Sequence, residues 1–267
     1  MSQRPLISTR WRSASGNRRI WKIVCSVCLV LLLHFLYWLE IGFFTPLGIM
    51  GIVFMVKALI ETWGQDTPTF LCPGTFKVFF LSYVLGLPGL FWQYANCTKA
   101  DISFPALWCG DGVDTSECER ANRQWVGLAL NFFGSIYSLS YEMHRFWWKA
   151  KPENQGKLHT TGLAALCIHP NYFGDLFTYT GWGLVSGTWC TQSLPLVSLG
   201  ALVLLVVPNS DAYLAERYAT EFPAYAEKTA TLIPFVHNQR VLRILAWGGI
   251  AASIYILIFS CPGACKM

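Results

Sequence analysis

Long apolar runs separated by short polar segments are the main feature of this chain. A helix needs roughly 20 predominantly apolar residues to cross a bilayer, and runs of this kind recur along the sequence. We expect transmembrane spans at 23–44, 47–63, 76–95, 125–141, 172–189, 194–207 and 241–259, with Pro208 ending the sixth. The pattern therefore predicts an all-α, multi-pass transmembrane helix bundle of about seven spans.

The polar segments suggest three regions along the chain. Residues 1–22 form a basic N-terminal segment, and residues 23–141 hold the N-terminal transmembrane helices together with a polar loop at 96–123. Residues 142–267 form a C-terminal membrane region, in which we expect a charged loop at 142–160 and another charged segment at 209–240. No long polar stretch predicts a separate soluble domain.

Composition supports a membrane environment and sets the orientation. Hydrophobic types make up 54% of the chain and charged types 13%, whereas soluble domains carry about 25% charged residues. Of the 20 Lys and Arg residues, 16 fall on the side of the predicted bundle that holds the N-terminus. The positive-inside rule puts that side in the cytosol or the matrix. No clustered basic face with stacking aromatics appears, which argues against nucleic acid as a partner.

The organelle stays open between the endoplasmic reticulum and the mitochondrial inner membrane. The first acidic residue is Glu40, and the preceding segment is rich in Arg and Ser. Such a segment is typical of mitochondrial targeting, but a basic flank that holds the first helix in the cytosol has the same composition. The loop at 96–123 falls on the opposite side and contains Cys97, Cys109 and Cys118. In an oxidising compartment two of these three can pair, and the sequence does not say which.

Three polar segments on the cation-rich side carry the candidate chemistry. They are Glu142 to Arg145, His169 to Asp175, and Glu216 to Tyr218 with Tyr225 close behind. Together they predict a pocket that suits an anionic cofactor, beside apolar helices that suit a lipid-like substrate. Asp175 is the sharpest member, because a carboxylate one turn inside a span is costly unless it is paired or bound. Asn171 is either the N-cap of that span or a ligand contact, and both interpretations stay open.

The order of these motifs resembles the steroid 5-alpha-reductase-like superfamily, over residues 142–235. The similarity is greatest to a family of uncharacterised membrane proteins in that superfamily; sterol reductases and isoprenylcysteine carboxyl methyltransferases are more distant. The residues that carry the resemblance are His169-Pro170-Asn171-Tyr172-Phe173-Gly174-Asp175, Gly181-Trp182-Gly183, Glu216-Arg217-Tyr218, Tyr225 and Ile233-Pro234-Phe235.

The resemblance implies a cofactor site built from the last helices and their loops, and no metal. The cofactor is NADPH in the reductases and S-adenosylmethionine in the methyltransferases. By position, the expected cofactor-binding residues are His169, Asn171, Tyr172, Asp175, Trp182, Glu216, Arg217 and Tyr225. The expected catalytic residues are Glu142, His144 and Tyr172.

One departure from the family pattern leaves the function open. The family has an arginine directly before the histidine, where this chain has Ile168; Arg145, Lys149 or Lys157 could substitute for it. The first hypothesis is an NADPH-dependent reductase of a lipid or steroid-like double bond. The second is a methyltransferase, against which Asn171 and Asp175 argue. The third is a non-catalytic accessory subunit of a large membrane complex, such as a respiratory assembly, with a structural lipid or no cofactor.

Overall fold

A computed structural model describes residues 27, 48–53, 56–57, 115–186 and 189–260. All regular elements in this part of the chain are helical, which confirms the predicted all-α class. They are α6 (Thr115–Ala150), η3 (Pro152–Asn154), η4 (Gly162–Ala165), α7 (Pro170–Ser186), α8 (Trp189–Ala201), η5 (Leu202–Val206), α9 (Val207–Arg217), α10 (Phe222–Lys228), α11 (Gln239–Tyr255) and η6 (Ile256–Ser260).

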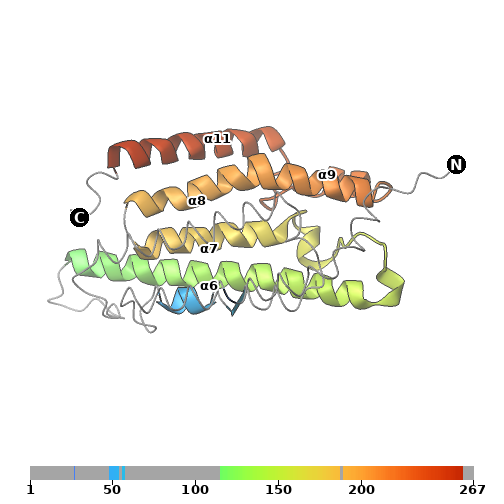
Figure 1. The fold of residues 1–267 in the computed structure, drawn as a ribbon, viewed down its shortest axis with the longest axis horizontal. Helices are drawn as coiled ribbons and strands as arrows, with labels where there is room; N and C mark the ends of the chain where they lie inside the picture. Colours follow the sequence, from blue (N-terminus) through green and yellow to red (C-terminus); the bar gives the residue numbers. More distant parts are fainter. Residues whose placement is uncertain (1–26, 28–47, 54–55, 58–114, 187–188, 261–267) are drawn as a thin grey trace.

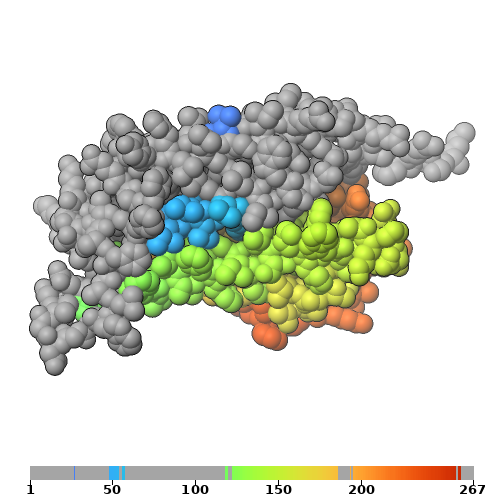
Figure 2. Space-filling model, turned by 90° about the horizontal axis from the view of Figure 1, so that it is seen from below, coloured from blue at the N-terminus to red at the C-terminus, as the bar shows by residue number. Residues whose placement is uncertain are grey.

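The long helices lie side by side in chain order, and each runs antiparallel to the one before it (Figure 1). Helix α6 packs on α7, α7 on α8, and α8 on α11. Residues 48–53 and 56–57 lie beside α6 (Figures 1 and 2), near enough to α7 for Lys57 to reach Asp175. As a result, the end of α6, the start of α7, the end of α9 and the start of α11 share one end of the bundle (Figure 1).

One continuous helix in the described part, Pro195–Arg217, is long and apolar enough to cross a membrane. It is 23 residues long and comprises most of α8, all of η5 and all of α9. The seven-span topology stays a prediction. The segment 1–22 and the spans at 23–44, 47–63 and 76–95 lie outside the described residues, except for the short pieces given above.

Helix α6 is longer than the predicted span at 125–141. It has 36 residues, starts inside the predicted loop at 96–123, and continues through Glu142 to Ala150. The prediction of a loop from residue 142 is therefore wrong, and the division after residue 141 falls within a helix. The reason is local pairing: Arg145 donates two hydrogen bonds to Glu142, of 2.7 and 3.1 Å, across one helical turn. Charges paired in this way do not interrupt a helix.

The prediction that Pro208 ends the sixth span is also wrong, because the helix continues to Arg217. The turn before this proline, η5, is a π-helix. A proline ring nitrogen has no hydrogen to donate to the preceding turn, and a wider turn accommodates that gap. The side chain of Asn209 donates a 2.8 Å hydrogen bond to the carbonyl of Leu205. The chain therefore passes Pro208 without leaving the helix.

Glycines hold α6 and α7 together at backbone distance. A Cβ atom built on Gly134 would lie 2.4 Å from the carbonyl oxygen of Gly174, and one on Gly181 would lie 2.4 Å from that of Gly127. Close approach through small residues is the usual packing of helices in a bilayer, where apolar side chains gain nothing by leaving lipid. This contact fixes how α7 lies along α6, and with it the start of α7.

Candidate functional site

His169 occupies the position directly before α7 and is held by the loop that precedes α11. Its backbone N–H donates to the carbonyl of Thr231 over 3.2 Å, and that of Ile168 donates to Ala230 over 2.8 Å. The buried imidazole has its Nε2 atom 2.8 Å from Oδ1 of Asp211 on α9. His169 thus links the start of α7 to α9 through a histidine–carboxylate pair.

Tyr172 lies in the first turn of α7 and stacks on His169. The ring centroids are 5.2 Å apart and the planes differ by 22°. The Tyr172 hydroxyl lies 3.1 Å from Oγ of Ser210 on α9. Ser210 and Asp211 did not emerge from the sequence because they follow Pro208, where the sixth span was predicted to end. Their only signal was a succession of three polar residues, Asn209 to Asp211, after a long apolar run.

Two cations converge on the hydroxyl of Tyr218, directly after α9. Nζ of Lys149 donates to this oxygen over 2.9 Å, and Nε of Arg217 donates over 3.2 Å. Lys149 also donates to the backbone carbonyl of Lys157 and lies over the Tyr218 ring, 4.7 Å from its centroid. Burial alone would raise the pKa of Tyr218, but the two donated hydrogen bonds lower it on balance.

His159 is buried beside this cation cluster, in a box of aromatic rings from α6. Its centroid lies 4.9 Å from that of His144 and 5.0 Å from that of Trp148. Its Nε2 atom lies 3.3 Å from Oγ1 of Thr161, while Nδ1 is buried and has no hydrogen-bond partner among the described residues. Sequence reasoning did not find this residue, because it lies in a charged segment without a motif.

The buried, electropositive surroundings of His159 predict a pH-dependent stability. Burial, and then the positive charges of His144, Arg145 and Lys149, lower its pKa from 6.5 to about 4. The unfolded chain therefore binds a proton at a higher pH than the folded chain does. We expect the free energy of unfolding to be highest above pH 6.5 and to fall as the pH drops towards 4, by up to about 1.4 kcal/mol per pH unit.

The measurement is thermal unfolding between pH 4 and 8 of the wild type and two variants. His159→Phe keeps an aromatic ring in the box and should flatten this part of the profile. His237→Phe changes an exposed histidine and should leave the profile as it is. Equal profiles for the His159 variant and the wild type would show that His159 does not titrate in this way.

The predicted carboxylates have separate environments rather than one shared pocket. Asp175 forms a 2.6 Å ion pair with Lys57, and the side chain of Lys57 is 6% exposed. Glu142 is buried and paired with Arg145, while Glu216 is exposed on α9.

The remaining predicted residues differ in their surroundings. The Tyr225 hydroxyl donates to the carbonyl of Ala164 over 2.6 Å, and Trp182 is buried inside α7. Burial raises the pKa of Tyr225. Asn171 is not an N-cap, because α7 already begins at Pro170. His144 is exposed, and its ring contacts the ring of His159.

Ile168 belongs to a small apolar core at the position where the resemblance leads one to expect an arginine. It is 5% exposed and packs in a cluster with Leu158, Tyr218 and Phe222. A cation here would lose its hydration without an ionic partner. Of the proposed substitutes, Arg145 is already paired with Glu142, whereas Lys149 lies with Arg217 around Tyr218.

These features define an all-helical protein that has a membrane-compatible helix, backbone-to-backbone helix packing and a buried polar cluster at one end. Residues 90–229 match the family described as "Protein of unknown function (DUF1295)". This match spans more than half of the chain, and the chain belongs to that family. Neither a curated protein nor a solved structure matches the chain.

Proposed function

We propose that this chain is a membrane-embedded reductase of the steroid 5-alpha-reductase-like type, which uses NADPH to reduce a double bond of a lipid. The order of the sequence motifs and the family match over residues 90–229 support this proposal. The observation that carries it is the position of the Tyr172 hydroxyl, held at 3.1 Å from Ser210 in a ring stacked on His169.

Tyr172 is the proton donor in this proposal. Reduction of a double bond needs a proton on one carbon and a hydride on the other, and a positioned phenol supplies the proton as a general acid. Ser210 can pass a replacement proton to the phenol, and the His169–Asp211 pair fixes the ring on which Tyr172 stacks. Tyr172 also packs against the apolar cluster around Leu232 and Val207, which suits a lipid-like substrate.

Lys149 and Arg217 fit the anionic groups of the cofactor. They converge on Tyr218 at the end of the bundle that holds Tyr172, and the buried Nδ1 of His159 beside them has no hydrogen-bond partner in the part of the chain that the structure describes. Two cations and an unused ring nitrogen form the type of donor set that holds a phosphate. They take the place of the arginine that Ile168 replaces. When bound, NADPH supplies the hydride.

Binding of NADPH to the purified full chain tests this proposal. We expect NADPH to raise the unfolding temperature of the wild type. Lys149→Gln should weaken the affinity roughly tenfold to a hundredfold, the effect of losing one charged hydrogen bond of about 1.5–3 kcal/mol. Lys151→Gln changes an exposed lysine two residues further on and should keep wild-type affinity. The proposal is contradicted if NADPH leaves the unfolding temperature of the wild type unchanged, or if both variants lose the same NADPH affinity. A rise in the unfolding temperature with S-adenosylmethionine alone would identify a methyltransferase.

A second candidate is a non-catalytic accessory subunit of a large membrane complex. It is favoured by the buried Ile168 and by the pairing of Asp175 and Glu142 with cations of the same chain. These two carboxylates, predicted to serve the cofactor site, already have partners. Co-migration with a large complex on a native gel, together with no response to either cofactor, would select this candidate.

We infer that the cation-rich end of the bundle faces the cytosol or the matrix. The described cations of α9, α10 and α11, with Lys149 at the end of α6, support this orientation under the positive-inside rule (Figure 1). Cys118 near the start of α6, at the opposite end, is disulfide-bonded, which suits an oxidising compartment there. The endoplasmic reticulum and the mitochondrial inner membrane both meet these conditions.

A further inference from the structure

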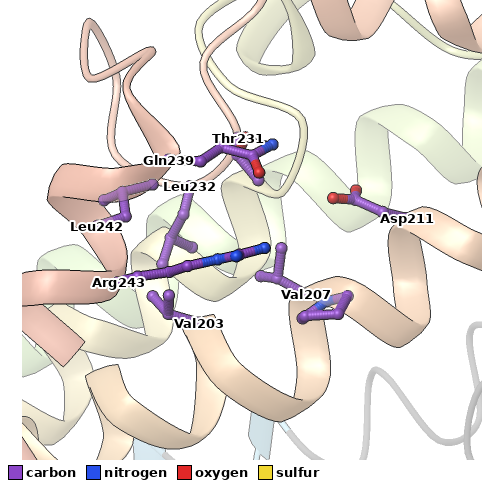
Figure 3. Close-up of a pocket in the computed structure, with 9 residues that line it drawn as sticks. Val203, Val207, Asp211, Thr231, Leu232, Gln239, Leu242 and Arg243 are labelled. Atoms are coloured by element: carbon purple, nitrogen blue, oxygen red, sulfur yellow. Dashed lines mark hydrogen bonds between the residues drawn. The ribbon is translucent and has the colours of Figure 1, made fainter. Parts of the chain in front are cut away.

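A pocket of about 80 Å³ lies beside the Tyr172 cluster, between α9, α11 and the loop that precedes α11 (Figure 3), and shares Asp211 with that cluster. Its floor is apolar, and four of its residues belong to the buried core of this half of the chain. Its rim is polar. The lining residues are Val203, Val207, Pro208, Asp211, Thr231, Leu232, Gln239, Leu242 and Arg243.

Opposite charges face each other across this floor. Figure 3 shows the Arg243 side chain extended between Leu232 and Val203, while the carboxylate of Asp211 points towards it from the other side. Arg243 has no ion-pair partner among the residues that the structure describes. Asp211 uses Oδ1 for His169, which leaves Oδ2 available. The pocket therefore offers one cation and one hydrogen-bond acceptor, separated by apolar side chains.

The surface around the pocket is strongly apolar. On α11, Ile244 is 70% exposed and Trp247 is 62% exposed, and Leu205 on η5 is 58% exposed. The side chain of Arg240 is also exposed, at the start of α11. Apolar side chains that give way to arginines, with a tryptophan nearby, are typical of the level at which lipid headgroups lie.

We propose that this pocket binds the headgroup of a phospholipid that carries a primary ammonium group. The lipid phosphate contacts Arg243, the ammonium donates to Asp211, and the acyl chains follow the exposed apolar faces of α11 and η5. Opposite charges at the two ends of the pocket complement a zwitterion and not a simple anion. A primary ammonium is compact and has N–H donors, whereas a trimethylammonium group is bulkier and has none. The pocket adjoins the apolar cluster on which Tyr172 packs and shares Val207 and Leu232 with it. A headgroup site there goes beyond the proposed function.

Lipid selectivity of the full chain tests this proposal. The purified protein is titrated in micelles with phosphatidylethanolamine, phosphatidylcholine or phosphatidylglycerol, and binding is followed by native mass spectrometry and by the unfolding temperature. We expect phosphatidylethanolamine to bind at least tenfold more tightly than either other lipid. Equal binding of all three, or a preference for phosphatidylglycerol, would overturn the proposal, and this comparison needs no variant.

Two variants separate the roles of the two charges. Arg243→Gln should lower the affinity for both phosphatidylethanolamine and phosphatidylcholine roughly tenfold to a hundredfold, because both lipids carry the phosphate. Asp211→Asn should remove the preference for phosphatidylethanolamine over phosphatidylcholine. Arg240→Gln is the matched control, since Arg240 is exposed and does not line the pocket. If the Arg240 variant loses as much lipid affinity as the Arg243 variant, the lipid is held by general attraction to the basic surface and not by a specific pocket. NADPH binding is measured on the same preparations, so that failure of the proposed function stays distinct from failure of the lipid site.

Discussion

Replacing Gly134 with leucine is expected to cost about 3 kcal/mol or more of stability and to lower the unfolding temperature by about 6–12 °C. A Cβ at this position would lie 2.4 Å from the carbonyl oxygen of Gly174 and 2.6 Å from the backbone nitrogen of Thr178. Both obstacles are backbone atoms, which cannot rotate away as the end of a side chain can. Helices α6 and α7 would have to separate along their contact.

The control is the same change at a glycine without neighbours. Gly248 on α11 is exposed, and a Cβ built there meets nothing within 4 Å. Gly248→Leu should therefore keep the wild-type unfolding temperature, or raise it slightly, because leucine favours the helix more than glycine does. Thermal unfolding followed by size-exclusion chromatography compares the two. Equal stability of the Gly134 and Gly248 variants would show that α6 and α7 do not approach each other as described.

Replacing Lys57 with methionine is expected to have the second large effect. The change leaves the Asp175 carboxylate without its partner at 2.6 Å, and removal of one member of a buried ion pair costs about 3–5 kcal/mol. The side chain of Asp175 is 23% exposed, which puts the expected loss near the lower end of that range. The same thermal unfolding measurement applies.

A double variant shows whether the loss comes from the unpaired charge. Lys57→Met combined with Asp175→Leu removes both charges and should recover most of the lost stability, since a buried ion pair is often no better than apolar side chains of similar size. Lys228→Met changes an exposed lysine and should have little effect. Asp175→Leu is also measured alone. If it lowers the free energy of unfolding as much in the Lys57→Met variant as in the wild type, the two residues are not coupled.

Part of the candidate site could be anticipated from the sequence, because the motif residues lie where apolar runs start or stop and therefore near helix ends. The prediction that His169, Tyr172, Arg217 and Tyr225 lie towards one end of the bundle follows from where the apolar runs stop. The partners of these residues could not be anticipated. Asp211 and Ser210 face His169 and Tyr172 only because α9 continues past Pro208 and runs beside the start of α7.

The partner of Asp175 illustrates the same limit. A carboxylate inside an apolar run needs a partner, and that need is visible in the sequence. The identity of the partner depends on which helix packs against that face of α7. Lys57 lies 118 positions away along the chain, in a different apolar run. Local spacing predicts pairs within one helix and carries no information about pairs between distant helices.

By itself, the sequence determined that this protein is helical, rich in apolar surface and basic at one end, because these properties follow from composition and from the local period of apolar residues. Only the tertiary structure decided which polar groups meet. Backbone contact between α6 and α7 sets the position of the start of α7, and the unbroken helix through η5 and α9 brings Asp211 to His169. Such contacts depend on how helices lie against one another in three dimensions, which no local pattern of residues encodes.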